Sequence, residues 1–363
     1  MRVLFFTYEP SPYRVAFFEH LGRDCELTVA FESHGSSYRD RQWFNSESQH
    51  FTKVYLDKPH SDEDAAMHTN IQSVIRRGFD RIVVSGYATR LEMKAIAYLT
   101  MKKIPFFMEV DGGLIRPDAR WKYWMKKQLV SSACGWFSSG KTTSEYLLHY
   151  GAKKDRIYEY PFSSLVQENI LPAPIPMDEK RRLREQLHLE NRNVILSVGQ
   201  FIHRKGFDVL LEAASKLPPD VHLYLVGGEP TEEYLELCRR WKLDNVHFEG
   251  FHPKQELLDY YRAADFFVLP TREDIWGLVV NEAMAMGLPV VTTDHCVAGL
   301  ELVEDGVNGY IVPVEDPEQL AEKMMNVLHS DLRAMGQKSL EKIQPYTIEQ
   351  MVQEHMKVFS QRR

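Results

Sequence analysis

The sequence predicts an α/β protein made of two Rossmann-like, doubly wound domains, and three observations support this prediction. Short apolar runs alternate with helix-length amphipathic segments along the chain, which is typical of parallel sheets covered on both faces. A stretch with four prolines between Pro161 and Pro176 separates two such series. The length of 363 residues is enough for two domains with separate cores. We expect two such domains to face each other across a cleft at the carboxyl ends of their strands.

The first series is identified by its apolar runs. The runs expected to form buried strands are residues 2–7, 26–31, 81–86, 104–110 and 135–140. Helical apolar spacing occurs at residues 13–22 and 89–103, between these strands. Right-handed crossovers would join the strands into one parallel sheet.

The second series repeats a strand followed by a helix. Its expected strands are residues 193–199, 222–228, 246–250, 265–270, 288–293 and 309–313. Its expected helices are residues 207–217, 232–242, 254–264, 277–286, 299–305 and 317–329. We therefore expect an N-terminal domain at 1–165, a C-terminal domain at 166–345, and a final helix in 346–363 that packs back on the N-terminal domain.

The composition excludes several classes of protein. Apolar residues make up 44% of the chain and charged residues 26%, and no apolar run reaches the roughly 18 residues that a membrane span needs. The net charge is −7, with 23 Lys and Arg against 19 Asp and Glu in residues 1–165 and 21 against 32 in the remainder. A nucleic-acid-binding protein would carry a larger basic excess, so no nucleic-acid partner is expected. The four cysteines lack zinc-type spacing, which favours reduced thiols and a cytoplasmic location.

Two basic residues follow the first strand of the second series. Arg204 and Lys205 lie between the strand that ends at Gly199 and a helix that opens near Gly206. A guanidinium and an ammonium at this place can neutralise a diphosphate, the first as a fork of donors and the second as a point charge. The alternative is a pair of solvated charges on a turn.

A second loop of the same kind follows the expected strand at 265–270. Asp274 lies in this loop, Gly277 opens the next helix, and Glu282 lies about two turns farther along. A glycine lets backbone amides approach a phosphate at a helix N-terminus, and a nearby carboxylate can accept hydrogen bonds from ribose hydroxyls. The alternatives are an N-cap for Asp274 and a solvated helix position for Glu282.

Three stretches, 199–213, 260–291 and 298–312, together resemble the retaining glycosyltransferases of family 4, which have the GT-B fold. The resemblance covers roughly residues 190–330 in matching order and spacing. It implies that Glu282 binds the ribose and Asp274 the sugar of a nucleotide-sugar donor. It also implies that the diphosphate is held by Arg204, Lys205 and the backbone amides of Gly277 and Leu278. Gly199 and Trp276 complete the expected donor-binding set.

The sequence departs from the family pattern at three places. The family usually has Glu at the position of Asp274. The Asp274 side chain is one methylene shorter than Glu, and Glu273 stands beside it. Gln200 stands where the family usually has an arginine, so we expect Arg204 to supply that charge. The pair Ala298–Gly299 stands where two glycines are usual.

The first domain contributes a second group of candidates. Asp111 follows an expected strand directly and precedes two glycines. In many family members a histidine near this strand end contacts the transferred sugar, and the resemblance puts Asp111 in that place, as a catalytic residue together with Arg204, Lys205 and Asp274. The alternative for Asp111 is an ordinary Asp-Gly turn. Glu9, Tyr13 and Arg14, after the first strand, are expected to face the acceptor.

Residues 116–130 mix basic and aromatic side chains. The basic ones are Arg116, Arg120, Lys122, Lys126 and Lys127, and the aromatic ones are Trp121, Tyr123 and Trp124. Such a helix suits the surface of an anionic membrane and would make the protein peripheral at the inner face. The alternative is a surface helix with its tryptophans in the core.

The resemblance and the two loops predict a retaining glycosyltransferase of the hexosyltransferase type. It would move a sugar from a nucleotide-sugar, with a UDP-sugar as the first choice, to a hydroxyl of a saccharide or lipid-linked acceptor in surface polysaccharide or glycolipid assembly. Cationic side chains and helix dipoles would neutralise the diphosphate, so no metal and no other cofactor is expected. Two alternatives stay open: a GT-B nucleotide-sugar epimerase and a non-catalytic nucleotide-sugar-binding partner.

Overall fold

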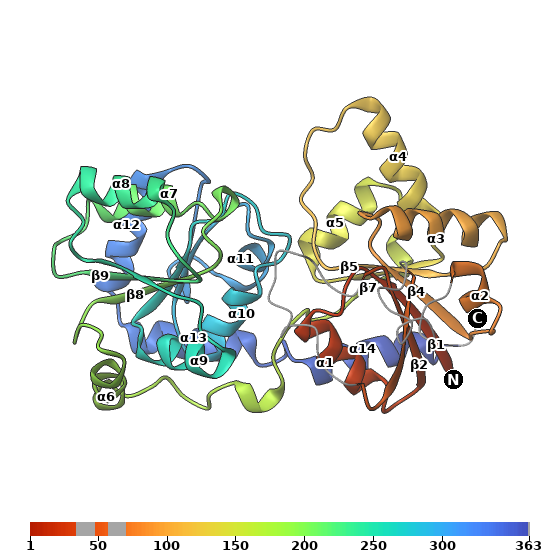
Figure 1. Cartoon of the computed structure of the whole chain (residues 1–363), viewed down its shortest axis with the longest axis horizontal. Helices are drawn as coiled ribbons and strands as arrows, with labels where there is room; N and C mark the ends of the chain where they lie inside the picture. Colours follow the sequence, from red (N-terminus) through yellow and green to blue (C-terminus); the bar gives the residue numbers. More distant parts are fainter. Residues whose placement is uncertain (34–47, 57–69, 362–363) are drawn as a thin grey trace. The chain divides into compact units, whose positions relative to one another are not determined.

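The computed structural model describes residues 1–33, 48–56 and 70–361, and it divides into two units (Figure 1). Unit 1 comprises residues 1–166 and 346–363, and unit 2 comprises residues 167–345. The division falls one residue from the predicted boundary, inside the proline-rich stretch. The chain's last helix is grouped with unit 1.

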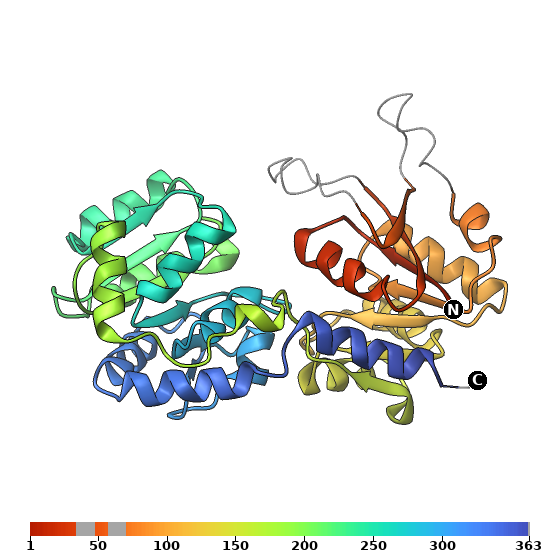
Figure 2. The same ribbon diagram turned by 90° about the horizontal axis from the view of Figure 1, so that it is seen from below.

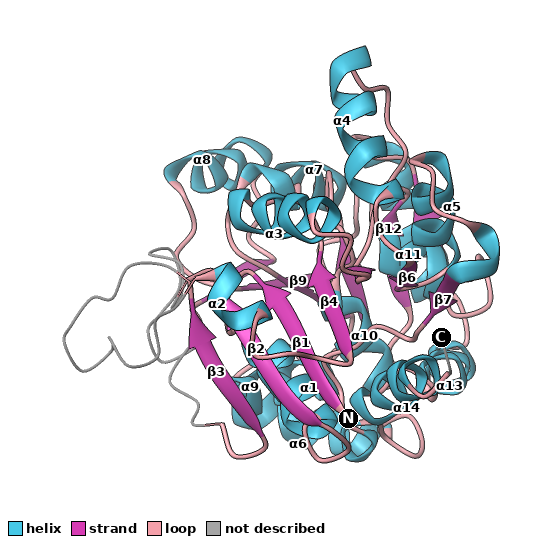
Figure 3. Cartoon of the chain, turned by 90° about the vertical axis from the view of Figure 1, so that its right-hand side faces the viewer, coloured by secondary structure: helices cyan, strands magenta, loops and turns pink. Residues whose placement is uncertain are grey.

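The described part of unit 1 is built on a parallel sheet of seven strands in the order β3-β2-β1-β4-β5-β6-β7 (Figure 3). The strands are β1 (Arg2–Thr7), β2 (Glu26–Phe31), β3 (Phe51–Tyr55), β4 (Arg81–Ser85), β5 (Phe107–Val110), β6 (Gly135–Ser138) and β7 (Ile157–Glu159). The helices are α1 (Pro12–Leu21), α2 (Ile71–Ile75), α3 (Arg90–Met101), α4 (Arg120–Ser131), α5 (Lys141–His149) and α14 (Ile348–Phe359), with a 3-10 turn at Lys154–Arg156. This strand order is the doubly wound one that the βα rhythm predicts.

Both faces of the unit 1 sheet are covered because side chains alternate along each strand. On β1, Leu4 and Phe6 join a core cluster with buried residues of α3 and α5. Phe5 points to the other face, where its ring lies 6.1 Å from that of Phe17 on α1 and 6.4 Å from that of Phe359 on α14. The last helix therefore completes the core of unit 1, packed against α1 and β7 (Figure 2).

Unit 2 is built on a parallel sheet of six strands in the order β10-β9-β8-β11-β12-β13. The strands are β8 (Val194–Val198), β9 (His222–Val226), β10 (Val246–Glu249), β11 (Phe266–Leu269), β12 (Val290–Thr293) and β13 (Gly309–Val312). The helices are α6 (Met177–Leu187), α7 (Phe207–Ala214), α8 (Glu232–Trp241), α9 (Lys254–Ala263), α10 (Leu278–Ala285), α11 (Val297–Leu302), α12 (Pro317–Leu328) and α13 (Leu332–Ile343), with 3-10 turns at Gln167–Asn169 and His203–Lys205. Each predicted strand of this half is present.

Helix α6 is held to the unit 2 sheet by buried charges. The Arg184 side chain is fully buried, and its guanidinium lies 2.7 Å from Asp265 Oδ1 and donates to the Ala263 carbonyl. Lys180 donates to the Ala264 carbonyl at 2.5 Å, and Asp265 Oδ2 accepts from the Val194 amide at 2.9 Å. Because Asp265 precedes β11 and Val194 begins β8, this group fixes the start of the two central strands.

Candidate functional site

Two loops of unit 2 meet at the carboxyl edge of its sheet. One follows β8 and the other follows β11, and these strands are neighbours in the sheet. The loops touch where Gly206 faces Pro270: a Cβ on Gly206 would lie 2.1 Å from the Pro270 carbonyl oxygen, and its φ is +70°. Only glycine satisfies both conditions, so the residue lets the two loops approach each other.

Arg272 ties the same two loops together. Its backbone amide donates to the Arg204 carbonyl at 2.8 Å, and its guanidinium donates to the His203 carbonyl at 2.7 Å. The guanidinium also binds Asp208 at the start of α7 through two bonds of 2.8 and 2.7 Å, and it pairs with Glu315. The sequence analysis missed Arg272, although its position two residues before Asp274 was a signal that it belongs to the loop.

The predicted diphosphate cations gather around Asp274. Lys205 Nζ lies 2.6 Å from Asp274 Oδ2, and Arg204 Nη1 lies 3.6 Å from Oδ1 of the same carboxylate. The side chains of Lys205 and Asp274 are 12% and 15% exposed, whereas that of Arg204 is 45% exposed. Asp274 therefore serves as the counter-ion of both cations here, a contact that the sequence analysis did not foresee.

The loop after β11 leads into helix α10 through Gly277. The φ of Gly277 is +105°, and a Cβ there would lie 2.8 Å from the Cys296 sulfur. The first amides of a helix have no acceptor within the helix, and the helix dipole makes this end positive. The backbone at Gly277 and Leu278 therefore offers donors at the edge where Lys205 and Arg204 lie.

Trp276 has a structural role that differs from the predicted contact with a donor. Its side chain is buried, with the residue 3% exposed, and the indole nitrogen donates to Asn281 Oδ1 at 2.8 Å. Its carbonyl accepts from the Ala298 amide at 2.8 Å. The aromatic ring is thus held against the beginning of α10.

Glu282 lies on α10 and is half-buried. Its carboxylate accepts a hydrogen bond from Tyr261 on α9 at 3.2 Å. Burial and the facing Glu282 carboxylate raise the pKa of Tyr261 well above its usual range, so this phenol remains a donor. Tyr261 is a second residue that the sequence analysis missed, and it orients the carboxylate that was predicted to bind the ribose.

Gly199 adjoins this group from the end of β8. A Cβ on Gly199 would lie 3.5 Å from the Lys205 side chain, so the lysine stem passes over it. Gln200, the departure from the family arginine, is exposed. Gly199, Arg204, Lys205, Asp274, Gly277 and Leu278 thus lie on the two adjoining loops and the start of α10.

The candidates of unit 1 lie at the carboxyl ends of β1 and β5. Asp111 follows β5 directly, is 30% exposed at its side chain, and accepts a hydrogen bond from Tyr160 at 3.2 Å. Burial raises the pKa of Asp111 to about 6; the nearby Arg14 charge opposes the rise and that of Glu109 adds to it. Asp111 thus has a side-chain partner in Tyr160, in addition to its position before two glycines.

Arg14 is buried in unit 1, contrary to the expectation that it faces an acceptor. Its side chain is 3% exposed, and Nη2 lies 2.5 Å from Glu109 Oε2. Tyr13 is half-buried, with its ring 5.8 Å from that of Phe162, and burial raises its pKa to about 12. Glu9 is half-buried in the loop after β1. Of the three, Glu9 and Tyr13 remain candidates for an outward contact.

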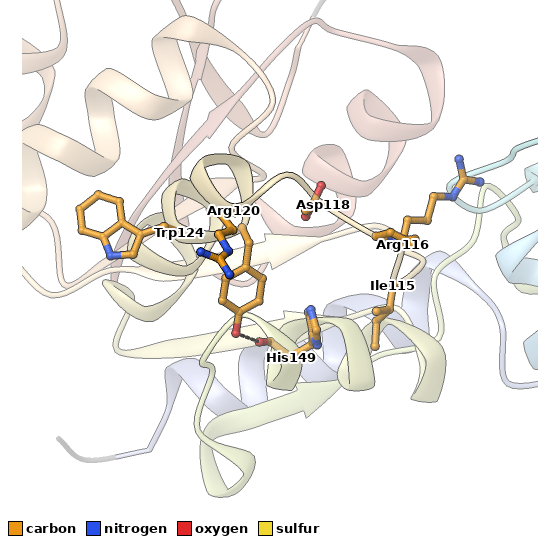
Figure 4. A pocket seen from close by; sticks show the side chains of 8 residues that line it. Ile115, Arg116, Asp118, Arg120, Trp124 and His149 are labelled. Atoms are coloured by element: carbon orange, nitrogen blue, oxygen red, sulfur yellow. Dashed lines mark hydrogen bonds between the residues drawn. The ribbon is translucent and has the colours of Figure 1, made fainter.

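The basic and aromatic segment forms helix α4, and its tryptophans are not in the core. Trp121 and Trp124 are each 64% exposed, and Met125, on the same side of the helix, is 38% exposed. Beside them lies an open cavity of about 580 Å³ lined by α4, the loop before it and the end of α5 (Figure 4). The lining residues are Ile115, Arg116, Pro117, Asp118, Arg120, Tyr123, Trp124 and His149.

Within residues 1–33, 48–56 and 70–361, no group of three or more His, Cys, Asp or Glu side chains is arranged to hold a metal ion. His203 and His295 lie beside the two loops, and His295 Nδ1 is hydrogen-bonded to the Arg272 carbonyl at 2.9 Å. These histidines take part in the loop structure of unit 2.

The comparison with known families decides the assignment of unit 2. Residues 179–350 match the model of "Glycosyl transferases group 1". The match covers most of unit 2 and makes it similar to the glycosyl transferases of this group. The two loops described above lie within the matched residues.

The curated relatives align with this chain over only part of their own length. A D-inositol 3-phosphate glycosyltransferase of Xylanimonas cellulosilytica is 34% identical over 228 residues, 60% of this chain and 54% of the relative. A GDP-mannose-dependent alpha-(1-6)-phosphatidylinositol monomannoside mannosyltransferase of Mycolicibacterium smegmatis is 34% identical over 177 residues, 45% of each chain. The chain thus spans about half the length of these glycosyltransferases.

Solved structures match the whole chain in fold. HepE of Anabaena, solved in complex with UDP and glucose, superposes with a TM-score of 0.75 at 17% identity, covering 100% of both chains. Sucrose-phosphate synthase of Thermosynechococcus elongatus gives a TM-score of 0.77 at 18% identity, covering 99% of this chain and 98% of the other. With its two parallel-sheet α/β units, the chain has the GT-B fold.

Proposed function

We propose that this protein is a retaining glycosyltransferase of family 4 that transfers a hexosyl group from a nucleotide-sugar to a hydroxyl acceptor. The observation that carries the proposal is the group formed by Arg204, Lys205 and Asp274 beside the N-terminus of α10. Two cations and a helix N-terminus at one sheet edge are suited to bind a diphosphate. The match of residues 179–350 to the model of the glycosyl transferases group 1 supports this use of the site.

The two cations act mainly on the leaving group. When the bond between the anomeric carbon and the diphosphate breaks, the leaving diphosphate gains negative charge, and fixed positive groups stabilise this charge better than water does. Lys205 is suited to this role because its ammonium is only slightly exposed. Asp274, released from Lys205 by the competing diphosphate, is then placed to accept hydrogen bonds from the donor sugar.

The proposed donor is a UDP-sugar. HepE, which shares the fold, has been solved with UDP and with UDP-glucose, which supports uridine as the first base to test. The names of the two relatives give D-inositol 3-phosphate and phosphatidylinositol monomannoside, and the second of these supports a glycolipid acceptor for this chain.

Product analysis tests the reaction type. The purified protein is incubated with a UDP-sugar and candidate hydroxyl acceptors, and the products are examined by proton NMR at the anomeric position. The expected product is a glycoside with the same anomeric configuration as the donor. A product with inverted configuration would contradict retention. An epimerised nucleotide-sugar formed without acceptor would show that the protein is an epimerase and not a transferase.

We also propose that α4 contacts an anionic membrane surface. The exposed side chains of Trp121, Trp124 and Met125 form an apolar stripe, and Arg120, Lys122 and Lys127 flank it. This arrangement matches an interfacial helix, whose aromatic residues enter the headgroup region while basic residues attract anionic lipids. No helix in the described part of the chain is long and apolar enough to cross a membrane.

Changing both Trp121 and Trp124 to alanine is expected to lower binding to vesicles that contain anionic lipid by at least about tenfold, because each indole buries a large apolar area in the headgroup region. The measurement is cosedimentation with vesicles of phosphatidylcholine and phosphatidylglycerol. Phe251→Ala is the matched control, since Phe251 is 61% exposed in unit 2 and should not affect binding. Equal binding of the double variant and wild type would disprove the contact.

A further inference from the structure

The Arg272 side chain is saturated with hydrogen bonds. A guanidinium has five N–H donors. Nη1 and Nη2 donate to the two Asp208 oxygens at 2.8 and 2.7 Å, and Nη1 also donates to the His203 carbonyl at 2.7 Å. Nε and Nη2 donate to the two Glu315 oxygens. Each donor thus has an acceptor among the described residues, and no donor is left over for a phosphate.

Glu315 brings a third loop into this contact. It lies between β13 and α12, and its φ of +62° is in the left-handed region, where a residue with a side chain is strained. Glycine would adopt this conformation without strain. The glutamate contributes what glycine lacks, a carboxylate that pairs with Arg272. The loop after β13 is therefore joined to the two loops that follow β8 and β11.

The backbone in front of Lys205 is held from the same place. The Arg272 amide donates to the Arg204 carbonyl at 2.8 Å, and the Thr271 hydroxyl oxygen lies 3.0 Å from that carbonyl oxygen. The guanidinium of Arg272 holds the carbonyl of His203, one residue earlier. Two consecutive carbonyls are thus fixed from the loop after β11, and the stem of Lys205 leaves the chain at the next residue.

The pair between Arg272 and Asp208 is partly shielded from water. The two side chains are 14% and 28% exposed. Burial alone would raise the pKa of Asp208, but the hydrogen bonds and the charge of Arg272 outweigh it and lower this pKa. Asp208 also lies in the first turn of α7, where the helix dipole favours a negative charge. A bidentate pair of this kind fixes direction as well as distance, which a lysine cannot reproduce.

We propose that Arg272 is a positioning residue, which holds Lys205 and Arg204 where they stabilise the leaving diphosphate. Asp208 and Glu315 hold Arg272 in turn. The effect on sugar transfer rests on the proposed function, whereas the contact between the loops does not. Fixed cations stabilise developing charge best when they are in place before the bond breaks, and a displacement of about 1 Å can lower the rate about 100-fold.

Hydrogen exchange tests the connection between the loops without any substrate. The amides of Lys205 and Gly206 donate to carbonyls within the loop after β8. In Arg272→Lys, which keeps the charge but has three donors in place of five, these two amides are expected to exchange at least about tenfold faster. Arg262→Lys is the matched control, because Arg262 also binds two carboxylates but lies in α9, outside the loops. Equal exchange of both amides in Arg272→Lys and wild type would overturn the proposal.

Glu315→Gln keeps the test informative if Arg272→Lys does not fold. The Glu315 side chain is 53% exposed, so this change leaves the core of unit 2 intact. The amide group of glutamine keeps one acceptor oxygen and has no charge. We expect the same two amides to exchange faster, by a smaller factor than in Arg272→Lys. Unchanged exchange in Glu315→Gln would remove Glu315 from the group that holds Arg272.

Steady-state kinetics test the effect on the reaction. Arg272→Lys is expected to lower kcat by at least about tenfold and to raise the donor KM by less than about threefold, because the cations are misplaced mainly with respect to the transition state. Arg262→Lys should keep wild-type values. A raised KM with an unchanged kcat would overturn the positioning role. If the wild type transfers no sugar, the proposed function fails, and hydrogen exchange still decides whether Arg272 holds the loops.

Discussion

Replacing Lys205 by alanine is expected to lower kcat/KM for sugar transfer by about 100- to 1,000-fold, the effect of removing one fixed group that stabilises developing charge. Lys205 Nζ lies 2.6 Å from Asp274, and its side chain is 12% exposed. The variant loses the cation and also leaves Asp274 with only Arg204, at 3.6 Å, as counter-ion. The Asp274 carboxylate, which has lost one of its two counter-ions, would then repel the diphosphate.

Steady-state kinetics with saturating acceptor provide the measurement, and Lys216→Ala provides the control. Lys216 lies in the same unit, 2.7 Å from Glu318, and is more exposed than Lys205. This control should keep wild-type kinetics, since an exposed ion pair contributes little. Unchanged turnover in Lys205→Ala would remove Lys205 from the catalytic group.

Replacing Asp265 by alanine is expected to lower the free energy of unfolding by about 3–5 kcal/mol, the usual effect of removing one partner of a buried ion pair. Arg184 is fully buried beside Asp265, and Lys180 Nζ lies 3.7 Å from the same carboxylate. Arg184 would keep its charge without this counter-ion. Burial, which already lowers the pKa of Lys180 to about 8, would lower it further because the Asp265 charge that raises it is gone. The amide of Val194 would also lose its acceptor.

Denaturation in urea measures this change, with Asp259→Ala as the control. Asp259 pairs with Arg262 at 3.3 Å, and its side chain is 38% exposed. The control should lose less than about 1 kcal/mol. If the two variants were equally stable, the Arg184–Asp265 group would not hold α6 to the sheet as described.

The location of Lys205 and Asp274 at the same edge of the sheet could be predicted from the sequence. Both loops follow parallel strands, and the carboxyl ends of such strands share one edge. Their direct ion pair could not be predicted, because it depends on side-chain conformations that the spacing of residues does not specify. Arg272 was overlooked for the same reason, since an arginine in a loop resembles any solvated charge until its partners are known.

Residues that were misjudged have side chains whose burial the pattern did not reveal. Trp276 stands next to a glycine in a polar loop, yet its ring is enclosed and bound to Asn281. Arg14 follows a strand end, but its partner Glu109 lies far along the chain in an apolar run. The contact of Glu109 with His355 depends on α14 packing against unit 1, which joins distant parts of the sequence.

Short strands at the edge of a sheet were also missed. Strand β7 has only three residues, none of them fully buried, and β3 has one exposed and one half-buried side chain between its buried ones. Neither forms the continuous apolar run by which the central strands were recognised. The central strands, which position the donor site, were all identified.

The most direct test of the diphosphate site is a thermal-shift panel of UDP, GDP and ADP with wild type, Lys205→Ala and Lys216→Ala. A ligand at 100 times its Kd should stabilise the folded protein by about 2.7 kcal/mol. We expect UDP to raise the Tm of wild type and Lys216→Ala but not that of Lys205→Ala. No shift of wild type with any nucleotide, or an equal shift in Lys205→Ala, would contradict a nucleotide-sugar site at Arg204, Lys205 and Asp274.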